Sequence, residues 1–136
     1  MAPDGVERKL IAFIDDKSRS PDRETCFTFD RLEFEPGSAN LAPDSQAQVR
    51  NIAAIMRCYP SVSVKFGGYT DNTGDPTANQ RLSHRAESAR QAEIGQGIDP
   101  TRIDADGYGA EHPVATNATE DGRQRNRRID IRVTKK

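Results

Sequence analysis

Two ionisable side chains of opposite sign mark the part of the sequence that is best suited to chemistry. Asp71 lies in the glycine-bracketed segment 67–75 (GGYTDNTGD), and Arg85 comes in the next predicted helix. The residues before the segment predict a strand, so both side chains fall where two elements meet, and such places often carry function. A carboxylate and a guanidinium held close together could grip a ligand that carries both charge signs.

Each of these residues also has a purely structural interpretation. An aspartate in a turn commonly accepts hydrogen bonds from nearby backbone amides, and most arginines on helices are solvated. Asp71 and Asp75 also look like the start of a calcium loop, but Pro76 stands where that loop requires glycine and Leu82 where it requires glutamate. The segment therefore predicts no calcium site of that geometry.

The cysteines and histidines predict no metal centre. Cys26 and Cys58 have no zinc-finger spacing to His84 or His112. The two cysteines could form a disulfide in an oxidising compartment, but two buried free thiols are the favoured interpretation. The sequence contains none of the common catalytic signatures, so it predicts neither an enzyme nor a cofactor.

The charge balance is that of a soluble domain. The 136 residues include 20 basic and 21 acidic ones, for a net charge of −1, which argues against general binding to nucleic acid. Basic residues crowd the end of the chain from Arg123 to Lys136. A solvated strand face is the favoured interpretation of this run, and attraction to an anionic polymer is the alternative.

The predicted elements place Asp71 and Arg85 on neighbouring ends. Apolar spacing predicts a short peripheral helix over 5–16 and longer helices over 43–58 and 76–94. Alternation predicts strands over 26–34, 61–66, 102–108 and 129–133. The order βαβαββ is that of an α+β sandwich, a mixed four-stranded sheet with helices packed on one face. Residues 1–25 are expected to be an appendage of helix and linker, and 26–136 the domain.

The charged residues of the closing strand stand at alternate positions in the sequence. Arg128, Asp130 and Arg132 alternate with apolar residues and are expected on the polar face of the sheet. Arg127 shares the parity of Ile129, so it is expected to point toward a pocket or a strand end.

Several motifs, in order, resemble those of the OmpA-like peptidoglycan-binding domain, the C-terminal module of outer membrane protein A, peptidoglycan-associated lipoproteins and flagellar stator proteins. The resemblance runs from Phe34 to Val133. Its motifs are the segments 34–41 (FEPGSANL), 68–75 (GYTDNTGD), Asn79 with Leu82 and Ser83, Arg85 with Ala86, 107–109 (GYG), 113–115 (PVA) and 122–128 (GRQRNRR).

The resemblance implies a domain that clasps meso-diaminopimelate in the peptide stem of peptidoglycan, without covalent chemistry. Asp71 would take the ammonium of that side chain, and Arg85 its carboxylate, which a planar guanidinium can bond with two N–H groups. Three neighbours would supply hydrogen bonds or hold the turn: Thr70, Thr73 and Asn79. Supporting residues would be Gly37, Ser38, Asn126, Arg127 and Arg128.

One departure from the family pattern concerns Arg85. Family members have two residues between the serine and the arginine, whereas only His84 separates Ser83 from Arg85. One missing residue in a helix rotates the later residues by about 100°. Either Arg85 is displaced from the site, or the start of the helix reorganises so that Arg85 keeps its place. We favour the second alternative. Glu93 and Gln96 stand where the family prefers apolar residues, so this helix is expected to pack less firmly.

The leading hypothesis is a non-catalytic periplasmic module that tethers an envelope protein to the cell wall by binding peptidoglycan. A membrane would be reached only through an N-terminal segment outside this chain. The alternative is an assembly module with a weakened or lost peptidoglycan site, whose partners are envelope proteins or a second copy of the chain. A hydrolase would need a metal site or a carboxylate pair in a cleft, and the sequence offers neither.

Overall fold

A mixed four-stranded sheet forms the centre of the computed structural model, which describes residues 5–21, 25, 27–29, 34, 40–70, 76–109 and 114–136. For residues 44, 76–80, 82, 83 and 109 only the backbone is described. The helices are α1 (Val6–Asp15), α2 (Gln46–Cys58), α3 (Pro76–Gly95) and α4 (Glu120–Asn126). The strands are β1 (Phe27–Thr28), β2 (Ser63–Tyr69), β3 (Ile103–Gly109) and β4 (Arg128–Lys135).

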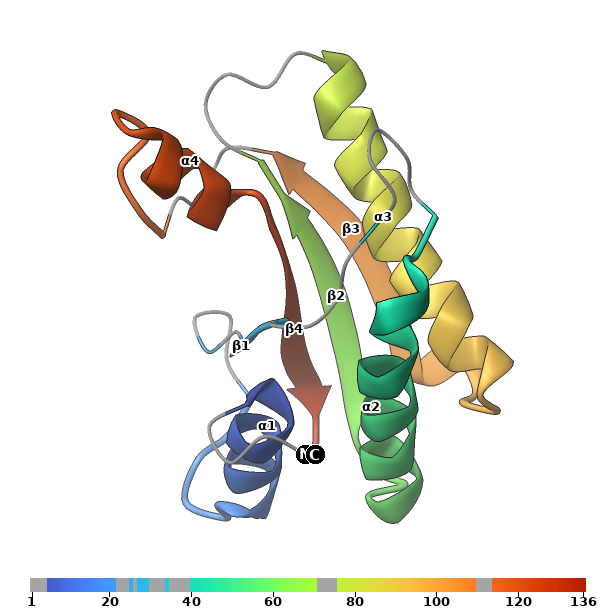
Figure 1. Cartoon of the computed structure of the whole chain (residues 1–136). Helices are drawn as coiled ribbons and strands as arrows, with labels where there is room; N and C mark the ends of the chain where they lie inside the picture. Colours follow the sequence, from blue (N-terminus) through green and yellow to red (C-terminus); the bar gives the residue numbers. More distant parts are fainter. Residues whose placement is uncertain are drawn as a thin grey trace.

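The sheet confirms the predicted α+β architecture. Its strand order is β1-β4-β2-β3, with β2 parallel to β3 and antiparallel to β4. The helices α2 and α3 lie side by side against one face of the sheet (Figure 1). A parallel pair such as β2 and β3 needs a crossover, and α3 supplies it, so the strand-to-helix junction after β2 follows from the topology.

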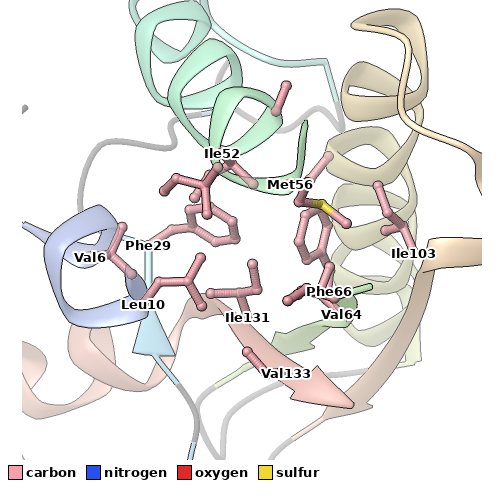
Figure 2. Close-up of a cluster of buried hydrophobic side chains, with 14 of the residues drawn as sticks. Val6, Leu10, Phe29, Ile52, Met56, Val64, Phe66, Ile103, Ile131 and Val133 are labelled. Atoms are coloured by element: carbon pink, nitrogen blue, oxygen red, sulfur yellow. The ribbon is translucent and has the colours of Figure 1, made fainter. Parts of the chain in front are cut away.

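The core lies between the helices and the sheet (Figure 2). The apolar stripe predicted for residues 43–58 is buried in α2, and a short 3-10 turn over Pro43–Ser45 precedes this helix. Val64 and Phe66 of β2 are buried, and so is Val62 just before the strand, as expected for a strand with one apolar face. Among the side chains of α3 that the structure describes, Ala86 and Ala89 are buried apolar ones, and Glu93 is buried as well.

The strand β2 is longer than predicted, because it runs on through two glycines to Tyr69. The ring of Tyr69 stacks on the ring of Tyr108 from β3, with centroids 5.3 Å apart. A Cβ atom at Gly67 would lie 2.9 Å from the Tyr108 ring and 3.0 Å from the Tyr69 ring. Gly67 therefore gives the two rings room to lie across the strand.

Helix α1 is part of the core, which corrects the expectation of a peripheral helix. Its buried apolar residues Val6, Leu10, Phe13 and Ile14 belong to the same cluster as the side chains of the sheet. A buried carboxylate, Glu7, accepts hydrogen bonds from Asn51 (2.8 Å) and Gln48 (3.4 Å) of α2. The division of the chain at residue 25 stays a prediction.

Lys136, at the other end of the chain, is bound to the C-terminal end of α1. Its ammonium donates to the backbone carbonyls of Asp16 (2.9 Å) and Arg19 (2.6 Å). It also lies 4.1 Å from the centroid of the Phe13 ring. A cation at a helix C-terminus is favourable, so the end of β4 helps to hold α1 in place.

Arg102 ties the end of α2 to the start of β3, and this contact yields a prediction. Its guanidinium donates to the backbone carbonyls of Met56 (2.7 Å), Tyr59 (2.9 Å) and Val62 (2.9 Å).

We expect Arg102→Met to lower the free energy of unfolding by about 2 kcal/mol, because partly buried carbonyls lose their donors. Urea denaturation measures the change. The exposed Arg125→Met is the control, and an equal effect of both substitutions would contradict the prediction.

Candidate functional site

The predicted site falls at the end of the domain where β2 finishes and α3 begins (Figure 1). Thr70 follows β2 directly and is buried. The predicted residues Gly37, Ser38, Asp71 and Thr73 lie outside the described residues, and of Asn79 only the backbone, in α3, is described. The pairing of Asp71 with Arg85 therefore stays a prediction, and the described geometry concerns the Arg85 side of the site.

Arg85 lies half-buried on α3, and its guanidinium carbon is 4.9 Å from the centroid of the Phe34 ring. The helix runs from Pro76 to Gly95 without a break, so the missing residue before Arg85 leaves the helix continuous. Burial, followed by the nearby charge of Arg81, lowers the pKa of the Arg85 guanidinium. A partly buried cation beside a second cation is a favourable place for an anionic ligand.

Phe34 contributes to the site in a way that sequence reasoning missed, since it was taken only as the first residue of a motif. It pairs with Leu41 in an isolated antiparallel bridge and packs, partly buried, against the hydrophobic core. Its ring reaches Arg85 from a distant part of the chain. No periodicity or spacing in the sequence indicates this contact.

The closing strand places a buried ion pair beside the end of β2. The guanidinium of Arg128 donates to the carboxylate of Asp130 over 3.0 Å, and each side chain is only 6% exposed. The second carboxylate oxygen of Asp130 accepts from the Thr28 hydroxyl over 2.7 Å. The Arg128 guanidinium also lies 4.0 Å from the centroid of the Tyr69 ring.

The expectation of a solvated polar face is therefore wrong for Arg128 and Asp130. They do share one face of the strand, as predicted, but the ring of Tyr69 packs against the Arg128 guanidinium there. Further along the same face, Lys65 lies near Tyr108 and pairs with Asp106 over 3.6 Å. The sequence predicted that these residues share one face of the strand. Their burial depends on aromatic rings from neighbouring strands, which the sequence did not predict.

Arg127 is exposed and lies directly before β4, so of the two expectations, a pocket or a strand end, the pocket is wrong. Residue 127 is the C-cap of α4, and β4 begins only at Arg128, so the strand parity used for that expectation does not apply. The Arg127 guanidinium donates to the Glu120 carboxylate over 2.7 Å. Arg123 binds the same carboxylate over 3.1 Å.

Asn126 supports the fold of this end through its buried carboxamide. The oxygen accepts from the backbone amides of Val114 (2.7 Å) and Ala115 (3.0 Å). The amide nitrogen donates to the Ala115 carbonyl (3.0 Å) and to the Asn117 side chain (2.9 Å). The four bonds exhaust one amide's usual capacity, so Asn126 holds the segment before α4 rather than a ligand.

The remaining candidate ligands for a metal do not assemble. In the part of the chain that the structure describes, no group of His, Cys, Asp and Glu could hold a metal ion. Cys58 is an exposed free thiol, which corrects the expectation of a buried one, and Cys26 lies outside the described residues. None of the described helices is long and apolar enough to cross a membrane.

Known proteins are similar to this chain in sequence and in fold. Residues 33–127 match the model of the OmpA family. Outer membrane porin F of Pseudomonas fluorescens is 41% identical over 103 residues, 75% of this chain and 32% of that protein. The peptidoglycan-binding protein ArfA of Mycobacterium bovis is 34% identical over 103 residues, again 75% of this chain and 32% of that protein.

One solved structure is similar over nearly its whole length. The cell wall anchor of the T6SS from Pseudomonas aeruginosa superposes with a TM-score of 0.72 at 26% identity, over 96% of this chain and 97% of that chain. By contrast, the chain spans about a third of the length of porin F and of ArfA. What those longer proteins do as wholes is a separate question from what this domain does.

Proposed function

Because the chain belongs to the OmpA family, we propose that it binds peptidoglycan without covalent chemistry and tethers a cell-envelope protein to the cell wall. The observation that carries the proposal is the half-buried guanidinium of Arg85, held beside the ring of Phe34 on α3, the helix that follows β2. Support comes from the relatives, one of which is named a peptidoglycan-binding protein and another a cell wall anchor. The compartment of this function is the periplasm.

The ligand chemistry we propose is a clasp for the zwitterionic end of diaminopimelate. Arg85 binds the carboxylate of that group, and Asp71 binds its ammonium. Thr70, Thr73 and Asn79 hold the turn or add hydrogen bonds to the ligand. A clasp of this kind accounts for the opposite charges of Asp71, which follows β2 in the sequence, and of Arg85 on α3, and it needs no metal ion and no general acid or base.

We expect Arg85→Gln and Asp71→Asn each to weaken binding to diaminopimelate-containing sacculi by at least about tenfold, because each removes a charge-assisted contact worth roughly 1.5–3 kcal/mol. Co-sedimentation of the purified chain with sacculi measures the binding, and circular dichroism checks the fold. Arg125→Gln is the control, since it removes an exposed cation from α4 and is expected to leave binding unchanged.

One outcome would overturn the clasp, and another would overturn the proposed function. Unchanged binding in both Arg85→Gln and Asp71→Asn would show that the clasp is not the site. A wild-type chain that does not sediment with sacculi, but forms a complex with an envelope protein or with itself, would favour an assembly module instead.

A further inference from the structure

The guanidinium of Arg85 lies against an aromatic ring, and another arginine of the domain shows what such a contact permits. Arg85 is 4.9 Å from the centroid of the Phe34 ring, and Arg128 is 4.0 Å from that of the Tyr69 ring. Arg128 also donates to the Asp130 carboxylate over 3.0 Å. A ring attracts the cation through its face and accepts none of the in-plane N–H bonds that a carboxylate uses. A guanidinium can therefore rest on a ring and bind a carboxylate at once.

The ring that contacts Arg85 is itself well anchored. Phe34 packs against the hydrophobic core and pairs through its backbone with Leu41, so its position is set by the fold. An arginine side chain carries about 2 kcal/mol of rotamer entropy. A fixed aromatic partner removes part of this freedom before a ligand arrives, and preorganisation of this kind raises affinity.

The charge around Arg85 suits an anionic group of the ligand. Arg81 lies one helical turn earlier, is exposed, and acts on Arg85 by charge repulsion. Like charges at this helical spacing are mildly unfavourable, and an anion bound beside them would relieve the repulsion. A carboxylate suits a planar guanidinium because it can accept two parallel hydrogen bonds.

From these observations we infer that Phe34 is a positioning residue for carboxylate recognition: its ring fixes the guanidinium of Arg85 in the orientation that binds the ligand carboxylate. The inference rests on the proposed function for its ligand. It adds a second residue to the carboxylate half of the clasp, from a segment of the chain that lies outside both β2 and α3.

The first experiment observes Arg85 directly and needs no ligand. The side-chain N–H signal of Arg85, assigned with Arg85→Lys, reports picosecond-to-nanosecond mobility through its heteronuclear NOE. We expect Phe34→Leu to make this signal more mobile than in the wild type, and Phe34→Tyr to leave its mobility unchanged. Equal rigidity of Arg85 in the wild type and in Phe34→Leu would overturn the positioning role.

The second experiment measures binding of two soluble probes by calorimetry. One probe is a disaccharide tripeptide that ends in meso-diaminopimelate, and the other has lysine in its place and so lacks the distal carboxylate. For the first probe we expect Phe34→Leu to weaken affinity about 5- to 30-fold, the range of a partly desolvated cation–π contact, and Phe34→Tyr to retain affinity within about twofold. For the lysine probe Phe34→Leu should have no effect.

Two controls separate positioning from a general loss of packing. Phe27→Leu also removes a partly buried ring packed against the core, but away from Arg85, and is expected to keep the affinity of the wild type. In the Arg85→Ala background, Phe34→Leu should weaken binding no further, since residues that act as one unit are not additive. Additive losses would overturn the inference.

The outcomes distinguish this inference from the proposed function. If Arg85→Gln abolishes binding while Phe34→Leu does not change it, the function stands and the positioning role falls. If the wild-type chain binds neither probe and no sacculi, the proposed function and carboxylate recognition fall together. The NMR comparison then still decides whether Phe34 fixes Arg85.

Discussion

Asp130→Asn is expected to lower the free energy of unfolding by about 3–5 kcal/mol, the cost of leaving one member of a buried ion pair without its partner. The pair that it breaks joins Arg128 to Asp130 over 3.0 Å, with both side chains 6% exposed. The carboxamide of the variant would still accept a hydrogen bond from the Thr28 hydroxyl, so the loss isolates the missing charge. Chemical denaturation at pH 7 measures it.

A matched substitution at the surface provides the control. Glu120 is exposed and binds Arg127 over 2.7 Å, and exposed ion pairs contribute little to stability. Glu120→Gln is therefore expected to change stability far less than Asp130→Asn, although both remove one charge from a pair. Equal effects would mean that burial of the Arg128 pair has no energetic consequence.

A double substitution separates the cost of breaking this pair from its net contribution. Replacing both charges, in Arg128→Met with Asp130→Leu, removes the unpaired charge that either single substitution leaves behind. Such replacements of buried ion pairs are often neutral or stabilising. We therefore expect the double variant to be more stable than Asp130→Asn, and a double variant as unstable as the single one would contradict this account.

Glu93→Gln is expected to stabilise the protein at neutral pH by about 3 kcal/mol. Glu93 is 1% exposed, and its Oε2 atom has no hydrogen-bond partner among the described residues. Burial raises the pKa of Glu93 to about 8 from its usual 4.5, although the charge of Arg57 opposes the shift. The folded chain at pH 7 must therefore keep a proton on Glu93 that the unfolded chain gives up.

The pH dependence gives the sign of this effect. Below pH 4.5 Glu93 is protonated in both states, so its protonation favours neither of them. As pH rises from 4.5 to about 8, only the unfolded chain loses the proton, and the free energy of unfolding falls. The advantage of Glu93→Gln should grow across this window and level off above it.

Urea denaturation of both proteins at several pH values between about 3 and 9 measures this advantage, because this range covers the titration of Glu93 and extends below the usual pKa of Glu120. Glu120→Gln is the control of opposite sign, because hydrogen bonds from Arg127 and Arg123 lower the pKa of Glu120. That substitution should be unfavourable near neutral pH, with an effect that fades as the solution becomes acidic. A difference between Glu93→Gln and the wild type that stays constant with pH would contradict the burial of the carboxyl.

Patterns within single elements predicted the fold well. The i, i+3, i+4 stripe from Val49 to Met56 is buried in α2, and the alternation after residue 61 is buried in β2. The proline at 43 opens a 3-10 turn and Thr119 caps α4, accepting from the Gly122 amide over 3.1 Å. These features are local, so neighbouring residues contain the information that specifies them.

Such local patterns could not predict the features that join distant segments of the chain. The burial of Arg128 and Asp130 depends on an ion pair and on a ring contributed by β2. The contact of Phe34 with Arg85 joins residues about fifty positions apart, from outside α2 to within α3. Strand parity did not apply to Arg127, because this residue caps α4 and lies just before β4. The clasp formed by Asp71 and Arg85 stays a prediction.

The attachment of α1 would have a mechanical consequence for the proposed tethering function. Lys136 binds α1 at the end of the sheet where Ser63 pairs with Lys135, while Thr70 and the predicted site lie at the opposite end, where Tyr69 pairs with Arg128. A pull between α1 and a bound polymer would run along the strands, so the hydrogen bonds between β2 and β4 would be sheared together instead of opening one after another. The paired strands β2 and β4 are thus oriented to resist tension along their length.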